Sequence, residues 1–308
     1  MNAATARTGA CPLCGGVSLA TVGPKGHQVY YRCRGCDLIV GSSLWESDVE
    51  RTVDELYDEK YLDKSRKFHP ATTSRLEDIL GRIERYTHGR RLFEVGFGNG
   101  QFLHTARERG WDVSGVEVSG AACAWASEEL ALPVRQGLFE AIDIEEQSAD
   151  AVASMETIEH MYDPDAFVRR AWQVLRPGGI LFLTTPNAGC ITARITGLAW
   201  RCYGDGHTLL FPARRLSLFL ERHGFEILRL ETRTVVPQAI LSYWRERFRK
   251  QDAQQARRPA GRISLGEIHE TRDRIDANPL LRAAKTVTNA TLNVTRTGEK
   301  TLLWARKP

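Results

Sequence analysis

From Arg90 onward, short apolar runs typical of buried strands alternate with stretches in which apolar residues recur every three or four positions. This alternation predicts a parallel β-sheet with helices on both faces. In such sheets ligands bind at the carboxyl ends of the strands, so the residues that follow each strand are the first candidates for a site. The expected strands are 91–95, 112–118, 133–136, 149–155 and 179–185, and the expected helices between them are 101–109, 121–130 and 163–175.

Before this region, residues 45–86 are rich in charge and helical in pattern. Leu76, Ile79, Leu80 and Ile83 have the spacing of an amphipathic helix that packs onto the coming sheet. Further along the chain, helical patterns cover 238–249 and 280–294, with a polar, loose stretch over 251–262 between them.

The first expected strand carries Glu94 near its end and continues into glycines at Gly96, Gly98 and Gly100. Glycines let the chain turn sharply and let a ligand lie against the backbone, and the following helix adds exposed N–H groups. The third glycine comes one residue too early for the dinucleotide motif G-x-G-x-x-G. Because Glu94 would repel a phosphate, the loop favours a ligand that carries positive charge. The alternative is a glycine turn in some other α/β domain.

Glu117 stands at the end of the second expected strand. In a doubly wound sheet this position lies beside the glycine loop, where a carboxylate can accept hydrogen bonds from both hydroxyls of a ribose. The alternative is an ordinary surface acid.

Two C-x-x-C pairs near the start of the chain, Cys11 with Cys14 and Cys33 with Cys36, are separated by 18 residues. This spacing indicates one tetrahedral zinc ion held by four thiolates, a closed and structural site. Gly15, Gly16 and Gly35 are expected to supply the tight turns, and residues 28–32 read as a strand of a zinc ribbon. Metal binding contributes on the order of 10 kcal/mol to the folding of such units. The remaining cysteines, Cys123, Cys190 and Cys202, are interpreted as packing residues.

The chain has 308 residues, 42% of them hydrophobic, and a net charge of +4. Residues 241–308 contain 15 Lys or Arg against 7 Asp or Glu, so this end carries +8 and the first 240 residues carry −4. A basic end indicates either an anionic partner or solvated helix faces. No apolar stretch approaches the ~20 residues of a membrane span, and no secretory signal is visible. We therefore expect a cytoplasmic protein without a membrane partner.

Taken together, these motifs resemble those of class I S-adenosylmethionine (SAM) dependent methyltransferases, in particular the ubiquinone-biosynthesis O-methyltransferase branch. The matching segments are the glycine loop, Met155–His160 with Asp163–Pro164, Leu175–Asn187, Gly206–His207 and Ser217–Phe225. The ribbon followed by Leu56–Tyr61 resembles a bacterial subgroup found in natural-product, sugar and surface-polysaccharide pathways. The resemblance implies a Rossmann-like seven-stranded sheet whose last strand, within 298–307, is antiparallel. The domains would be a zinc ribbon (1–45), a helical linker or lid (46–89) and the methyltransferase domain (90–308). A helical insertion at 237–297, before the last strand, is expected to cover the substrate.

The resemblance also implies roles for single residues. Glu94, Gly96, Gly98 and Gly100 would hold the methionine part of SAM, and Glu117 the ribose. Gln136 and Gly137 occupy the position near adenine where relatives have Gly-Asp; no carboxylate follows here, which leaves backbone groups and Leu138 or Phe139. Met155 and Glu156 would lie under the cofactor.

Methyl transfer requires alignment, which can supply about 7–11 kcal/mol, and a base only for some acceptors. His160 and His207 are the candidate bases, with a structural role as the alternative for each. Glu159 is a third candidate, with the alternative that it orients a neighbour. Tyr57, Tyr61, Trp200, Tyr203, Tyr243 and Trp244 either wall the site or pack elsewhere.

The expected activity is transfer of a methyl group to oxygen, carbon or nitrogen of a small molecule such as a secondary metabolite, a sugar or a quinone-like compound. The alternative is an RNA methyltransferase that uses the ribbon and the basic C-terminal region. An Asn-Pro-Pro-Tyr type motif for attack by a base amine is absent, which argues against it. A non-enzymatic relic fits poorly, because the acids and glycines are all present.

Overall fold

The computed structural model describes residues 9–45, 68, 70–204, 206–252 and 278–308. Its centre is a seven-stranded sheet of order β10-β11-β8-β7-β4-β5-β6. Five strands are parallel, namely β4 (Arg91–Val95), β5 (Asp112–Glu117), β6 (Val134–Gln136), β7 (Ala149–Met155) and β8 (Leu175–Pro186). The last strand, β11 (Lys300–Arg306), lies antiparallel between β8 and β10 (Glu226–Arg233). The predicted sheet is thereby confirmed, including its antiparallel strand.

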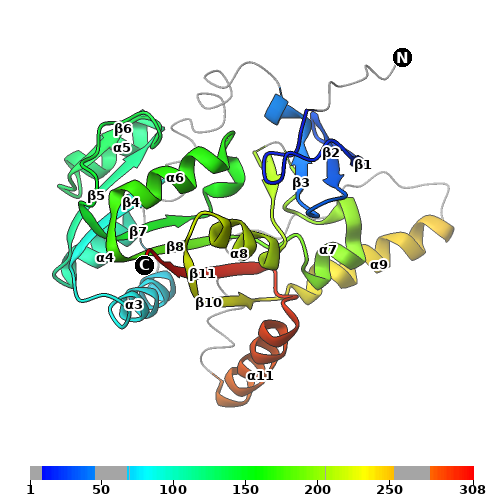
Figure 1. The fold of residues 1–308 in the computed structure, drawn as a ribbon. Coiled ribbons are helices and arrows are strands. Elements are labelled where there is room, and N and C mark those ends of the chain that lie inside the picture. Colours follow the sequence, from blue (N-terminus) through cyan, green and yellow to red (C-terminus); the bar gives the residue numbers. More distant parts are fainter. Residues whose placement is uncertain (1–8, 46–67, 69, 205, 253–277) are drawn as a thin grey trace.

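Helices cover the sheet on both faces, as Figure 1 shows. One core contains α3 (Pro70–Ile83), α4 (Gln101–Glu108) and α5 (Gly120–Glu128), with Phe182 and Trp304 from the sheet. The opposite core contains α6 (Pro164–Val174) and α8 (Ala213–Arg222). The expected boundaries of the helices between the parallel strands are correct within two residues. The fifth parallel strand begins earlier than expected, at Leu175 and not at residue 179, directly after the end of α6.

The N-terminal ribbon consists of β1 (Leu19–Lys25), β2 (Gln28–Cys33), β3 (Ile39–Gly41) and the short helix η1 (Ser42–Trp45). Its sheet gains a fourth strand from the far part of the chain, because β9 (Leu209–Leu210) pairs with β3. Arg215 on α8 also forms an ion pair of 2.9 Å with Asp37. The ribbon therefore shares a sheet and a core with the larger domain, a contact that the local sequence pattern did not reveal.

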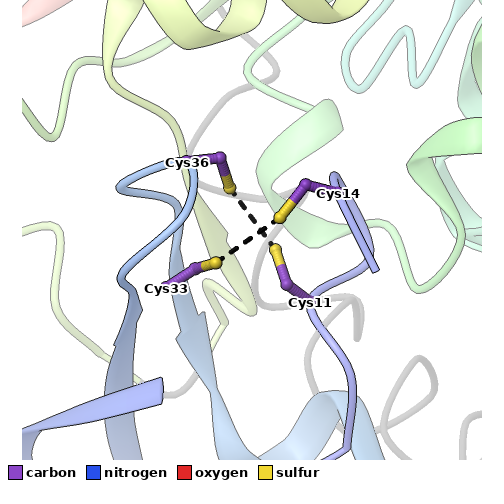
Figure 2. Close-up of side chains that lie close together, drawn as sticks. All are labelled: Cys11, Cys14, Cys33 and Cys36. Carbon is purple, nitrogen blue, oxygen red and sulfur yellow. Dashed lines mark hydrogen bonds between the residues drawn. The ribbon is translucent and has the colours of Figure 1, made fainter. Parts of the chain in front are cut away.

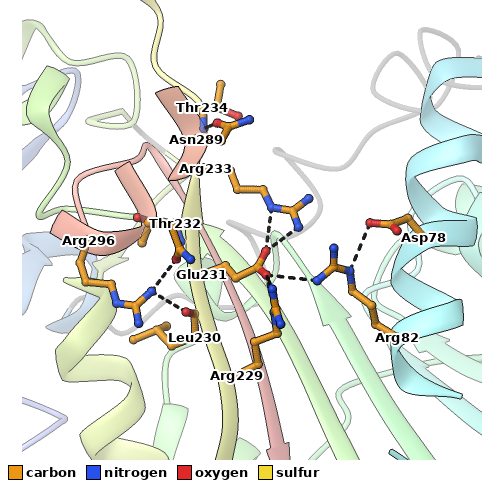
Figure 3. Close-up of polar contacts among 11 residues, drawn as sticks. Asp78, Arg82, Arg229, Leu230, Glu231, Thr232, Arg233, Thr234, Asn289 and Arg296 are labelled. Atoms are coloured by element: carbon orange, nitrogen blue, oxygen red, sulfur yellow. Dashed lines mark hydrogen bonds and ion pairs between the residues drawn. The ribbon is translucent and has the colours of Figure 1, made fainter. Parts of the chain in front are cut away.

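The helix α3 is tied to the edge of the large sheet by a buried carboxylate. Glu231 on β10 is 3% exposed and receives ion pairs from Arg229 and Arg233, its neighbours on the same strand, and from Arg82 of α3 at 3.1 Å (Figure 3). Removing one arginine partner would leave part of the buried charge of Glu231 uncompensated. The network therefore fixes α3, which carries part of the wall of the cavity described below.

The insertion before β11 contains α9 (Pro237–Asp252) and α11 (Pro279–Thr295), which confirms both expected helices. The helix α9 packs against α7 (Ile191–Thr196). Leu56, Tyr57, Tyr61 and most of the stretch 251–262 lie outside the described residues. None of the described helices has both the length and the apolar character that crossing a bilayer requires.

Candidate functional site

A cavity of about 670 Å³ opens at the carboxyl ends of β4, β5 and β7. Its volume falls within the range of small-molecule sites, and most of its lining is apolar. The predicted residues Glu94, Gly96, Gly98, Glu117, Gly137, Met155, Glu156 and His160 all line it. The sheet topology thus brings together residues that span 66 positions of sequence, as expected for a site at the carboxyl ends of parallel strands.

The glycine loop adopts a left-handed backbone conformation that residues with a side chain rarely adopt. Gly96, Gly98 and Gly100 have φ angles of 70°, 54° and 74°, and Gly100 caps the N-terminus of α4 in the left-handed conformation. A Cβ atom at Gly96 would lie 2.4 Å from Thr157 Oγ1. Glycine at position 96 is therefore needed both for the turn and for the close approach of the next strand's loop.

Glu117 is held in place by the backbone around it. Its Oε2 accepts a hydrogen bond from Gly98 N–H at 3.0 Å, and its Oε1 accepts from Val118 N–H at 2.8 Å and Ser119 N–H at 3.2 Å. The residue is 8% exposed and lines the cavity. A carboxylate offers about four acceptor positions, so Glu117 retains room for at least one hydroxyl of a ligand while it pins the glycine loop.

Glu94 is the second acid of the cavity and is 2% exposed. Within the described part of the chain, its Oε2 atom has no hydrogen-bond partner. Burial and, next, the charge of Glu117 raise the pKa of Glu94 well above the ordinary value. Because buried polar atoms are normally paired, this carboxylate oxygen in the cavity wall is a candidate contact for a donor or a cation of a ligand.

Glu156 follows β7 in a strained conformation, with φ of 54°. Thr184 donates a hydrogen bond of 2.8 Å to its Oε1, and Lys300 Nζ lies 3.2 Å from the same oxygen. Burial alone would raise the pKa of Glu156, but the charge of Lys300 and the hydrogen bond from Thr184 outweigh it and lower the pKa. The cavity thus contains an ionised pair that the sequence did not reveal, since Lys300 comes from β11, 144 positions away.

His160 and His207 lie side by side, with ring centroids 4.8 Å apart. His160 Nδ1 contacts the carbonyl oxygen of Gly206, and His207 Nδ1 lies 2.7 Å from that of Cys202. A carbonyl oxygen only accepts, so each Nδ1 carries a proton and each neutral ring has its lone pair on Nε2. Burial and, next, the neighbouring His207 lower the pKa of His160 to about 4. Of the two rings, only His160 lines the cavity.

Glu159 is buried behind these rings and accepts a hydrogen bond of 2.9 Å from Thr185. Its ligand atoms and those of both histidines lie within 4.8 Å of one another. Burial and, next, the charge of Glu156 raise its pKa well above the ordinary value. Glu159 does not line the cavity and is bonded to Thr185 in the core, so the geometry favours a supporting role for it over that of a base.

Two expectations about the adenine side differ from the geometry. The Gln136 side chain is exposed, donates to the Val118 carbonyl at 3.2 Å and does not line the cavity. Glu140, three residues after Gly137, does line it. The path of the turn after β6 decides which side chain faces inward, and no local spacing rule predicts that path.

The aromatic candidates are not walls of the cavity where they are described. Trp200 and Tyr203 are buried against the ribbon, and Trp244 is 42% exposed on α9. Other parts of the wall come instead from α3 and β11, with Arg75, Leu76, Ile79, Lys300 and Leu302.

The four N-terminal cysteines converge at a second site, which Figure 2 shows. Sγ of Cys11 lies 3.5 Å from that of Cys36, and Sγ of Cys14 lies 3.5 Å from that of Cys33. Four thiolates around a zinc ion at about 2.3 Å would be about 3.8 Å apart, so the cluster has the size of such a site. Gly35 lies in the turn of the second cysteine pair, as expected, and Asp37 N–H closes this turn by donating to the Cys33 carbonyl at 2.9 Å. The left-handed conformations next to the cysteines fall on Gly15 (φ 68°) and Asp37 (φ 60°).

Comparisons with known proteins agree with this geometry. Residues 57–230 match the family model described as "Methyltransferase domain". A probable S-adenosylmethionine-dependent methyltransferase of Mycolicibacterium smegmatis is 29% identical over 181 residues, which cover 58% of this chain and 64% of the relative. The ubiquinone biosynthesis O-methyltransferase of Idiomarina loihiensis is 33% identical over 117 residues, which cover 35% and 48%. The chain thus spans about half to two thirds of the length of these curated relatives.

Solved structures show the same fold. A SAM-dependent methyltransferase from Archaeoglobus fulgidus superposes with a TM-score of 0.52 at 16% identity, over 81% of this chain and 100% of that one. Phosphoethanolamine N-methyltransferase 2 of Haemonchus contortus, solved with S-adenosyl-L-methionine, gives 0.53 at 19% identity, over 83% and 60%. Together with the family match over more than half of the sequence, the seven-stranded sheet and its glycine loop show that this chain belongs to the family of S-adenosylmethionine-dependent methyltransferases.

Proposed function

We propose that this protein uses SAM to methylate an oxygen, carbon or nitrogen atom of a small molecule. The observation that carries the proposal is the Oε2 atom of buried Glu94 beside the glycine loop, which has no hydrogen-bond partner among the residues that the structure describes. A positively charged amino group would satisfy this oxygen, and Glu117 on the next strand would accept a ribose hydroxyl. The residues present therefore fit the cofactor. Bound there, SAM would supply a methyl group attached to a positively charged sulfur, and this sulfur, the leaving group, would become the neutral thioether of S-adenosylhomocysteine.

The chain's own contribution is to hold and align. The glycine loop has no side chains at Gly96, Gly98 and Gly100, so a cofactor can lie directly against its backbone. Glu117 fixes that loop by accepting a hydrogen bond from Gly98 N–H. Phe139 is buried at the cavity wall and Leu138 is half exposed there, so both suit an adenine ring. Met155 and Glu156, which are expected under the cofactor, line the same cavity, and Lys300 joins them through its ion pair with Glu156.

His160 is the candidate catalytic base for an acceptor that must lose a proton. With Nδ1 bonded to the Gly206 carbonyl, its Nε2 lone pair is the basic position, and a pKa of about 4 keeps it neutral at physiological pH. His207 lies behind it and orients the ring. Neutral imidazole can take a proton from an acceptor hydroxyl as the new bond forms.

The acceptor class follows from the relatives and from the size of the cavity. Ubiquinone biosynthesis O-methyltransferases, as their name states, act in quinone synthesis, and a cavity of 670 Å³ suits a small molecule. None of the relatives named above is described as acting on RNA. We therefore retain secondary metabolites, sugars and quinone-like compounds as the acceptor class.

We further propose that the cysteine cluster holds one structural zinc ion. Its support is the convergence of four sulfur atoms in the ribbon of a chain whose seven cysteines, all within the described part, are free of disulfides. Four thiolates leave no open coordination position for catalysis.

The proposed function is tested by calorimetry with the zinc-loaded protein and S-adenosylhomocysteine, followed by transfer of a labelled methyl group to a panel of phenolic, sugar and amine acceptors. We expect binding of one molecule per chain and label on at least one acceptor. Absence of binding with zinc loaded would refute the proposal.

A first prediction concerns Glu94 and protons. Its raised pKa keeps the free carboxyl protonated over a wider pH range, whereas a bound cation favours the ionised form. Binding of SAM should therefore release a proton, and the affinity should fall as the pH drops through the raised pKa. Calorimetry in two buffers of different ionisation enthalpy measures this release.

The control for that measurement is Glu94→Gln, which has the same shape and no titration. The variant should bind more weakly and should lose the proton release that Glu94 contributes. Equal proton release in the variant and the natural protein would show that Glu94 does not face the cofactor's amino group.

A second prediction concerns His160. Replacing it with glutamine should lower kcat by about 10²–10⁴-fold for a hydroxyl acceptor found in the panel, because the base is lost. The affinity for S-adenosylhomocysteine should stay within about twofold. His223→Gln is the matched control, since His223 lies outside the cavity lining and is bonded to Asp165 of α6 at 2.8 Å. Unchanged turnover in His160→Gln would assign His160 to structure.

A further inference from the structure

A segment between η3 (Gly197–Ala199) and β9 lies between the ribbon and His160, the candidate base. Residues 202–204 and 206–208, which we call the histidine loop, connect η3 to β9. The pairing of β3 with β9 places the ribbon directly against this loop, and both lie on the same side of the molecule in Figure 1. The loop carries His207 and the Gly206 carbonyl that contacts His160.

Tyr30 is the side chain of the ribbon that enters the loop. It lies in the middle of β2, is fully buried, and its ring meets that of Tyr203 edge-on at 4.9 Å. Its hydroxyl accepts a hydrogen bond from Gly204 N–H at 3.0 Å. The same hydroxyl contacts the Gly204 carbonyl and lies 3.0 Å from the His207 carbonyl, so its one proton goes to either.

Further bonds from the ribbon hold the two ends of the loop. Gln28 Nε2 donates to the Gly204 carbonyl at 3.1 Å, and Ser43 fixes the Gln28 amide by donating to Oε1 at 2.6 Å. At the other end, Gly41 N–H donates to the Thr208 carbonyl at 2.8 Å. The loop backbone is therefore bonded to the ribbon on both sides of its histidine.

The opposite side of the loop is bonded to the residues of the cavity. His160 Nδ1 bonds the Gly206 carbonyl, Thr208 N–H donates to the Glu159 carbonyl at 3.0 Å, and the His207 ring packs against that of His160. A shift of the loop would thus move the acceptor that fixes the His160 tautomer.

We propose that Tyr30 is a positioning residue, through which the cysteine-bound ribbon sets the orientation and tautomer of His160. The catalytic meaning of this link rests on the proposed function, but the link itself is a structural claim. It assigns the ribbon a role beyond stability, because hydrogen bonds from the ribbon hold the histidine loop in place.

The proposal depends on the hydroxyl of Tyr30 more than on its ring. Phenylalanine would keep the packing against Tyr203 but would leave the Gly204 N–H and the carbonyls without this partner. Buried peptide groups that lose their partner are costly, so the loop is expected to move toward water or to exchange between conformations. Either change loosens the Gly206 carbonyl.

The experiment compares Tyr30→Phe with the matched control Tyr31→Phe in the full-length, zinc-loaded protein. Tyr31 is the next residue of β2 and lies on the other face of the strand, against Trp45. The readout is the ¹⁵N spectrum of the imidazole side chains, with His160 and His207 assigned through His160→Gln and His207→Gln.

In the natural protein and in Tyr31→Phe, both rings should show the single tautomer protonated at Nδ1. In Tyr30→Phe, these signals should broaden or move to a tautomer mixture, with zinc content and the affinity for S-adenosylhomocysteine unchanged within about twofold. Signals identical to those of the natural protein would overturn the proposal.

If Tyr30→Phe loses its zinc or fails to fold, Gln28→Leu replaces it as the deciding variant, because this change removes one bond to the Gly204 carbonyl and keeps the tyrosine. It should shift the same signals by a smaller amount, and unshifted signals would again overturn the proposal. Failure of the proposed function would appear elsewhere, as absent binding of S-adenosylhomocysteine or as full turnover in His160→Gln.

Discussion

Replacing Glu117 with alanine should weaken the binding of S-adenosylhomocysteine by about 10- to 100-fold. A hydrogen bond to a charged group is worth about 1.5–3 kcal/mol, and each 1.4 kcal/mol is about tenfold in affinity. The variant loses the acceptor for a ribose hydroxyl and also frees Gly98 N–H, which Glu117 holds at 3.0 Å. Calorimetry with the zinc-loaded protein measures the change.

The matched control is Glu128→Ala, which removes an exposed acid from α5, the helix that follows Glu117. It should leave the affinity unchanged. Gly96→Val provides an independent variant, since any Cβ there meets Thr157 Oγ1 at 2.4 Å. If Glu117→Ala and Gly96→Val both bind as tightly as the natural protein, the cofactor lies elsewhere.

Replacing Cys36 with serine should remove the bound zinc and unfold the ribbon. A structural zinc ion contributes on the order of 10 kcal/mol to a unit of this size. Leu38 and Val40 of the ribbon belong to the same core as Leu209, Phe211 and Leu216, so the loss should also lower the thermal unfolding temperature of the whole protein. Metal content by mass spectrometry of the native protein, together with a melting curve, measures both effects.

Cys123→Ser is the control, because Cys123 lies in α5 outside the cluster. This variant should keep one zinc ion per chain. A full zinc content in Cys36→Ser, or a natural protein without metal that melts like the loaded one, would contradict a structural zinc site.

The sequence was most informative where a site is built from neighbouring residues. Glu94 and the three glycines lie within seven positions, and their chemistry is readable from spacing alone. Glu117 follows from the rule that adjacent parallel strands end at one edge. The two cysteine pairs are equally local, and their convergence is confirmed by the structure.

Most of the features that the sequence did not predict depend on contacts between distant segments. Lys300 meets Glu156 across 144 positions, and Tyr30 meets Gly204 across 174. No periodicity records such a pairing. The same reason explains why β9, a strand of two residues, was not expected to join the ribbon. Asp37 in the left-handed turn shows a different limit, since glycine is the usual residue there but aspartate tolerates the conformation.

Residues of local motifs and residues brought together from distant segments correspond to two halves of the site. Under the proposed function, the cofactor half consists of local motifs on β4 and β5, whereas the acceptor half combines α3, β7 and β11 with the histidine loop, which bonds to His160. The local motifs carry the resemblance to the family, and the contacts between distant segments are expected to determine the acceptor. The link from the ribbon to His160 belongs entirely to the second half.

A crystal structure of the zinc-loaded protein with S-adenosylhomocysteine would show directly whether the two carboxylates hold the cofactor. We predict that the amino group of the ligand lies within hydrogen-bonding distance of Glu94 Oε2 and that a ribose hydroxyl lies on Glu117. The sulfur atom should face the space between Met155 and His160. A ligand bound outside this cavity, or bound within it with both carboxylates unused, would contradict the proposed cofactor site.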